Sequence, residues 1–72
     1  MNELTKKQII VLNCITDFIN KNGYSPSVRE LCKLAGVNSP ATIHTHLKNL
    51  KGKGYIAYIP NINRTIRVIK GA

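Results

Sequence analysis

The sequence predicts a mainly α-helical domain that ends in a small β-hairpin, with three helices followed by two antiparallel strands. Two of the expected helices open with a capping box, and glycines follow the helical patterns. After residue 54 the chain becomes rich in β-branched and aromatic residues, which favour strands. A chain of 72 residues is long enough for one domain. We therefore expect a single domain over residues 1–72, with helices at about 5–22, 28–35 and 40–51 and strands at about 55–59 and 65–69.

The first helix has a well-defined start and end. Thr5 and Gln8 form a capping box, and Leu4 and Ile9 can pack across it as a hydrophobic staple. Gly23 can end the helix in a left-handed conformation. The helical period predicts a buried side made of Ile9, Leu12, Ile15 and Ile19, with Val11 and Phe18 at its margin.

The second helix is shorter and leads directly into the third. Ser27 and Glu30 form a second capping box, and Gly36 is placed to end the helix. Only residues 37 and 38 separate Gly36 from the next expected cap, and two capped helices joined by so short a turn form a helix-turn-helix. The apolar face predicted for the second helix consists of Val28, Leu31, Cys32 and Ala35.

The third helix carries an apolar stripe on one side and small polar side chains on the other. Ser39 is the expected N-cap, and Pro40 is the expected first helical residue. Ile43, Leu47 and Leu50 form the stripe. The opposite side has no charged residue in its first two turns, and its short side chains would let the helix approach base edges in a DNA groove. Taken alone, the same pattern also fits an ordinary amphipathic surface helix.

The remaining chain is expected to form the hairpin. Gly52 and Gly54 interrupt the third helix, and residues 60–63 form the turn between the strands. Alternation leaves Arg64 and Arg67 to solvent or phosphate. Three helices followed by such a hairpin occur in the order of a winged helix-turn-helix. The residues expected to pack on the helical side of the hairpin are Ile56, Tyr58, Ile66 and Val68.

The charge of the chain favours a polyanionic partner. Eleven Lys and Arg residues against three Asp and Glu residues give a formal charge of +8, which fits nucleic acid, although a ribosome or an anionic membrane surface would fit the charge equally well. We expect no membrane span and no signal peptide, and hence a cytoplasmic, nucleoid-associated protein. Cys14 and Cys32 lack metal-ligand spacing and are expected to be buried, reduced residues, so we expect no metal and no cofactor.

Five segments match a known family in order and spacing. They are Leu4-Thr5 with Gln8, Gly23 to Leu31, Ser39 to Leu50 with its Thr42-Ile43-His44 and His46-Leu47 runs, Lys53 to Ile56, and Arg64-Thr65-Ile66. On these residues the chain resembles the N-terminal DNA-binding domain of LexA repressors, in the branch found in Gram-positive bacteria. The resemblance implies a transcriptional repressor of the SOS response that binds an inverted-repeat operator in double-stranded DNA. It also implies base contacts in the major groove from Ser39, Ala41, Thr42, His44 and Thr45.

The chain also departs from the family pattern. Ser25 stands where the family often has the first of two prolines, which should loosen that loop slightly. Lys51 stands where an acidic residue is common, and Ile59-Pro60 stands where the family usually has Asp-Pro, so both changes should make the DNA side more positive. Nothing corresponds to the family's C-terminal serine-lysine peptidase domain, so we expect no enzymatic activity. We expect either an excised domain or a stand-alone regulator of the kind that mobile elements carry, without an SOS role. Because the family dimerises mainly through that missing domain, we expect a monomer in solution that pairs as two copies on DNA.

Cationic side chains are the candidate phosphate contacts, because cations and helix N-termini both favour anions. Arg29 could alternatively pair with Glu30 or with a neighbouring element, and His46 is expected to pack or to contact phosphate rather than bases. A winged helix that docks proteins is the alternative function, whereas an RNA-binding module would carry exposed aromatic residues on a sheet. The expected phosphate contacts are Arg29, Lys48, Lys51, Lys53, Arg64 and Arg67, together with Ser39 and the free amides of the third helix.

Overall fold

The computed structural model describes residues 4–71 and contains three helices followed by a two-stranded antiparallel sheet. This arrangement confirms the predicted fold class, a winged helix-turn-helix. The predicted domain range of 1–72 includes residues 1–3 and 72, which lie outside the described part. The elements are α1 (Lys6–Asn22), α2 (Val28–Ala35), α3 (Pro40–Gly52), β1 (Ile56–Ala57) and β2 (Arg67–Val68).

Both predicted capping boxes are present. At the start of α1, the backbone N–H of Gln8 donates to Thr5 Oγ1 at 3.2 Å and the N–H of Thr5 donates to Gln8 Oε1 at 3.0 Å. The same reciprocal pair joins Ser27 and Glu30 at the start of α2, at 3.2 and 2.9 Å. These bonds satisfy amides that have no partner inside a helix, and so they fix where α1 and α2 begin.

Ser39 and Pro40 start α3 as predicted, whereas the expected end of the helix is wrong. Ser39 occupies the N-cap position, but its side chain makes no capping hydrogen bond, because only its carbonyl accepts the first helical amides. Gly52 does not break the helix and instead lies in its last turn. Gly54 makes the actual reversal, with φ of 83° in the left-handed region that a side chain disfavours.

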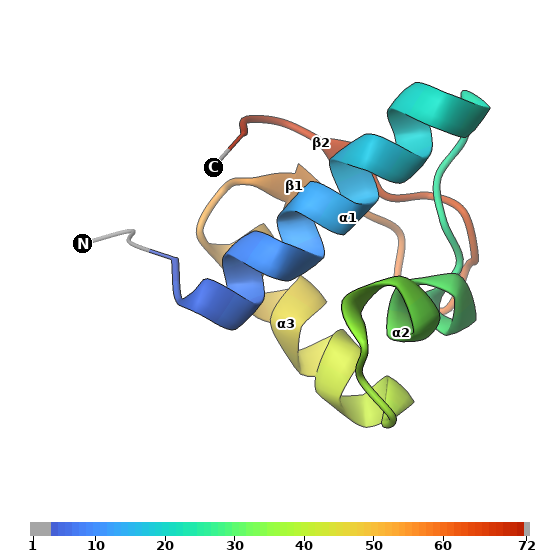
Figure 1. The fold of residues 1–72 in the computed structure, drawn as a ribbon. Helices are drawn as coiled ribbons and strands as arrows, with labels where there is room; N and C mark the ends of the chain where they lie inside the picture. The colour runs from blue at the N-terminus through green and yellow to red at the C-terminus, as the bar shows by residue number, and fades with distance from the viewer. Residues whose placement is uncertain (1–3, 72) are drawn as a thin grey trace.

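The core lies where the three helices meet one another and where α3 meets β1. In Figure 1, α1 runs along the molecule with α2 and α3 on the same side of it. The stripe of α3 is confirmed, since its three apolar residues are at most 2% exposed. On α1 the prediction was off by part of a turn: Val11 is buried and Ile9 is only half-buried. The buried apolar residues are Val11, Leu12, Ile15, Leu31, Ile43, Leu47, Leu50, Ile56 and Ile66.

The strands are much shorter than the predicted ranges of 55–59 and 65–69. Pairing is limited to Ile56 with Val68 and Ala57 with Arg67. Beyond them, the N–H of Ile59 donates to the Thr65 hydroxyl oxygen at 2.9 Å instead of to a backbone carbonyl. A side chain therefore ends the ladder and closes the long loop of the hairpin. We call residues 58–66 the wing.

Candidate DNA-binding surface

The start of α3 presents small, uncharged side chains to solvent. Ala41, Thr42, His44 and Thr45 are exposed, and between them Ile43 is fully buried. Burial of Ile43 and its stripe orients the helix, so the residues predicted from the helical period to face outward do so. The Thr45 hydroxyl donates to the Ala41 carbonyl at 3.1 Å, and its oxygen still has lone pairs that can accept a hydrogen bond.

A groove runs between α3, the start of α2 and the wing. It is lined by residues 26–29 at the start of α2, by residues 58–66, and by Pro40, His44, Leu47 and Lys48 of α3. The fold thus brings together residues that lie far apart in the sequence. Among the predicted contact residues, the groove includes Arg29, His44, Lys48 and Arg64.

The wing tip was missed by the sequence analysis, which treated residues 60–63 only as a turn. Ile59 and Ile62 are more than half exposed, and both line the groove together with Asn61 and Asn63. Asn61 has φ of 65°, a left-handed conformation that asparagine tolerates better than most residues. The alternation of Asn and Ile in a turn was the signal that could have identified an exposed tip.

Lys51 and Lys53 have partners within the domain. Lys51 Nζ donates to the Tyr58 carbonyl at 3.4 Å and lies over the Tyr58 ring. Lys53 Nζ donates to Gln8 Oε1 at 3.0 Å and joins the end of α3 to the start of α1. Neither lysine lines the groove, so the structure does not place these two predicted phosphate contacts within it alongside His44 and Lys48.

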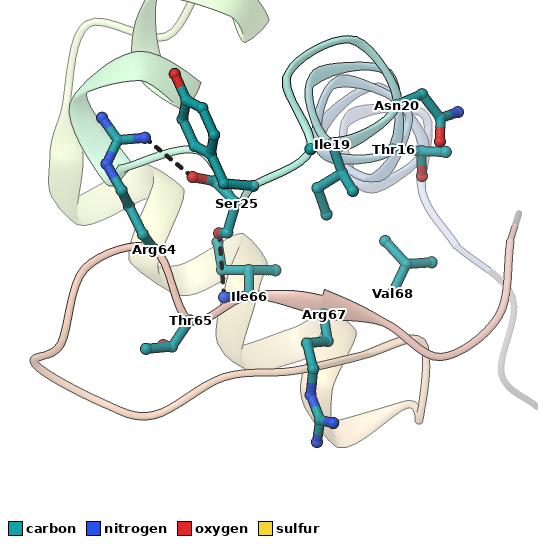
Figure 2. Close-up of a pocket in the computed structure, with 11 residues that line it drawn as sticks. Thr16, Ile19, Asn20, Ser25, Arg64, Thr65, Ile66, Arg67 and Val68 are labelled. Atoms are coloured by element: carbon teal, nitrogen blue, oxygen red, sulfur yellow. Dashed lines mark hydrogen bonds between the residues drawn. The ribbon is translucent and has the colours of Figure 1, made fainter.

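Arg67 also lies away from the groove. It lines a second hollow, between the end of α1 and β2, and its side chain points away from α1 in Figure 2. Arg29, by contrast, is exposed at the edge of the groove, and within residues 4–71 it has no ion pair. The alternative that Arg29 pairs with Glu30 is therefore not what the structure shows.

Arg64 is the partner of Glu30. Its Nη1 atom lies 3.0 Å from Glu30 Oε1 and also donates to the Ser25 carbonyl at 3.0 Å. Arg64 is exposed, as expected, but these two partners hold its guanidinium group against the start of α2 and the loop before it. The backbone N–H of Ser27 and then its hydroxyl, together with Arg64, hold the pKa of Glu30 below its ordinary value because they favour the carboxylate.

His46 packs at the edge of α3 and is half-buried, with its Nδ1 atom buried and unbonded among residues 4–71. Within the same residues, no three His, Cys, Asp or Glu side chains are grouped so that they could hold a metal ion. Cys14 and Cys32 are free thiols that are half-buried and pack against the core. Burial raises the pKa of Cys14, and the negative charge of the nearby Asp17 adds to this effect. No described helix has the length and apolar character needed to cross a bilayer.

Comparison with known protein families identifies the family of this chain. The family model for the LexA DNA binding domain matches residues 1–65. The chain belongs to the LexA DNA-binding domain family.

Curated LexA repressors align over almost the whole chain. The LexA repressor of Desulfatibacillum aliphaticivorans is 49% identical over 70 residues, which cover 97% of this chain and 34% of that protein. Those of Alkaliphilus oremlandii and Staphylococcus aureus are 45% and 42% identical, covering 93% and 96% of this chain and 32% and 33% of theirs. The chain therefore spans about a third of the length of these LexA repressors.

Ser25 shows how this LexA family member departs from the family pattern. The serine stands where a proline was expected, and we predicted that the loop would be looser. That prediction is wrong. Ser25 is buried, its hydroxyl donates to the Pro26 carbonyl at 3.1 Å, and its Oγ accepts the N–H of Ile66 at 3.1 Å. A proline ring could make neither bond, so the serine ties the loop before α2 to the hairpin, as Figure 2 shows.

Proposed function

We propose that this chain binds double-stranded DNA sequence-specifically as the DNA-binding domain of a LexA-like transcriptional repressor, with α3 in the major groove. The observation that carries the proposal is the exposed, uncharged start of α3 beside a groove that Arg29 and Lys48 border. The major groove of B-DNA admits one α-helix, and a helix with short outward side chains can approach the base edges closely.

Base readout would fall to the exposed side of the first two turns of α3. His44 can donate to or accept from a purine edge, depending on which ring nitrogen carries the proton. The hydroxyl of Thr45 can accept, and the methyl groups of Ala41 and Thr42 can contact the methyl group of thymine. Ser39, at the N-terminus of α3, has a hydroxyl that no capping bond uses and that is available to a base or a phosphate.

Phosphate contacts would position α3 on the duplex. Arg29 and Lys48 flank the groove from α2 and α3, and the uncapped N-terminus of α3 carries the positive end of the helix dipole. Lys51, Lys53 and Arg67 lie farther from the groove and would serve phosphates at the edges of the site. With eleven cationic residues in the chain, a large part of the affinity would depend on salt.

A repressor of this type would use two copies on one operator. Each copy would place α3 in one half of an inverted repeat, because a pair related by a twofold axis reads the same sequence on both strands. We infer that the domain is a monomer in solution and pairs on DNA.

Selection of bound duplexes from a random pool tests this function directly. Sites that emerge as spaced inverted repeats, and lose enrichment with His44→Ala but not with Asn13→Ala on the exposed side of α1, would support it. Weak binding of all sequences alike would leave only non-specific affinity. No duplex binding at low salt would favour the alternative, a winged helix that docks a protein through α3.

A further inference from the structure

We propose that Arg64 is a positioning residue, which holds the wing against the start of α2 and thereby sets the groove between the wing and α3. The proposal rests on the proposed function, because it assigns the groove to DNA. It assigns Arg64 a different role from the other cationic residues of the surface. Arg64 would act through its neighbours in the protein and not as a phosphate contact.

The guanidinium group of Arg64 has three partners, all at the α1–α2 loop or the first turn of α2. Nη1 meets Glu30 Oε1 at 3.0 Å and donates to the Ser25 carbonyl at 3.0 Å. The guanidinium carbon lies 4.9 Å from the centre of the Tyr24 ring, in cation–π geometry. Tyr24 in turn packs edge-on against Phe18 of α1, with ring centres 5.5 Å apart. We call Tyr24, Ser25, Glu30 and Arg64 the wing clamp.

The capping box holds the Glu30 side chain in place independently of Arg64. Its Oε1 atom accepts the N–H of Ser27 in the capping box that starts α2. An exposed ion pair usually contributes little, because ordering two long side chains opposes the Coulomb attraction. Here the side chains of Arg64 and Glu30 are 45% and 35% exposed, but the rotamer of Glu30 is already restricted by its capping hydrogen bond. The pair therefore ties the wing to a fixed point of the helix-turn-helix.

The backbone of Arg64 supports the same role. Its φ of 61° lies in the left-handed region, which is unfavourable for a residue other than glycine or asparagine and persists where surrounding contacts enforce it. Two residues later, the N–H of Ile66 donates to Ser25 Oγ, so the wing is attached to the same loop at two points. Figure 2 shows both attachments converging on Ser25. With the end of the wing fixed in this way, its tip stays on the side of the molecule that α3 faces.

A change that removes the charge of Glu30 separates positioning from phosphate contact, since the two roles predict opposite effects on DNA affinity. Glu30→Gln keeps an acceptor for the cap but weakens the hold on Arg64, and it makes the protein more positive. If Arg64 contacts phosphate, this change would release its side chain and the Glu30→Gln protein would bind DNA more tightly. If Arg64 positions the wing, the Glu30→Gln protein should bind the selected operator about two- to fivefold more weakly, the range that an ion pair of this exposure supports. Asp17→Asn on α1 is the matched control, because Asp17 is exposed, has no ion pair within residues 4–71, and adds the same charge when changed.

Two further measurements complete the test. In hydroxyl-radical footprints, Glu30→Gln and Arg64→Gln should reduce protection where the wing lies while leaving protection by α3 intact. In free protein, both variants should speed hydrogen exchange of the Ile66 amide, the double variant should add little, and Asp17→Asn should not change it. Tighter operator binding by Glu30→Gln, or unchanged Ile66 exchange, would overturn the proposal. If the unaltered chain binds no duplex, the proposed function fails, and the exchange measurement still decides the clamp.

Discussion

Ser25 Oγ accepts the backbone N–H of Ile66 at 3.1 Å, a buried hydrogen bond between residues 41 positions apart in the sequence. Ile66 is itself part of the core, at 7% exposure. One serine hydroxyl thus joins the loop between the first two helices to the hairpin that follows the third. The bond makes the position of the wing depend on a residue outside it.

Ser25→Ala should lower the free energy of unfolding by about 1 to 3 kcal/mol, because the buried amide of Ile66 loses its acceptor. Thermal or denaturant unfolding measures the change. Ser39→Ala is the matched control, since the Ser39 side chain makes no capping bond and its removal should alter stability by less than about 0.5 kcal/mol. Equal effects of the two changes would show that the Ser25 bond contributes nothing.

His44→Ala should weaken binding to the selected operator by about 1 to 3 kcal/mol and affect random DNA much less, because a base contact carries sequence information. Thr45→Ala should behave similarly, with a smaller loss since its hydroxyl proton is used within the helix. Equilibrium binding to both duplexes at one salt concentration measures this. Equal losses on both duplexes would remove base readout from these two residues.

Lys48→Ala should weaken binding to every sequence alike and reduce the slope of log affinity against log salt by about one. Lys48 is exposed on α3 and lines the groove. Lys21→Ala, at the far end of α1, removes the same charge outside the groove and should leave the slope nearly unchanged. A slope that does not respond to Lys48→Ala would assign that lysine to solvent.

Acid should weaken the attachment of the wing. The pKa of Glu30 is lowered in the folded state, so its contribution to stability is fully present above the unfolded pKa, about 4.3, and is lost as the pH falls through the folded value. The stability difference between the unaltered chain and Glu30→Gln should therefore be constant near neutral pH and shrink below about pH 4 to 5. In an Arg64→Gln background the same difference should be smaller, and an identical pH dependence there would exclude Arg64 as a cause.

Leu31→Ala should destabilise the domain by about 2 to 5 kcal/mol, because Leu31 is the one fully buried side chain that the structure describes on α2. Circular dichroism during urea unfolding measures this. The exposed Leu34 on the same helix provides the control, and Leu34→Ala should cost far less. Comparable losses would mean that α2 is not held through Leu31.

Local signals in the sequence were sufficient to predict the helices. Thr5 with Gln8 and Ser27 with Glu30 act within three residues of each other, and Gly23 and Gly36 end their helices in the expected left-handed conformation. The exposed side of α3 could be predicted from periodicity, because the rotation of the helix about its axis is fixed by the burial of Ile43, Leu47 and Leu50.

The wing could not be predicted in the same way. The strands beside it were predicted too long because residues 55–59 and 65–69 are rich in β-branched and aromatic residues, yet the Thr65 hydroxyl takes the place of the backbone ladder beyond Ala57. The partners of Arg64 lie 34 or more residues away in the chain, and no local pattern links them. Contacts of this kind depend on how α2 and the hairpin meet in space, which periodicity does not specify.

The two-residue strands have a consequence for how the protein behaves at high concentration. A sheet edge with unpaired backbone groups is a template on which another chain can add a strand. Here the ladder ends after two residue pairs, and at its ends the Thr65 hydroxyl takes the amide of Ile59 and the Tyr55 carbonyl takes those of Ile69 and Lys70. Each strand therefore offers only a two-residue outer edge near the exposed isoleucines of the hairpin, and short edge strands are one way in which proteins limit edge-to-edge aggregation.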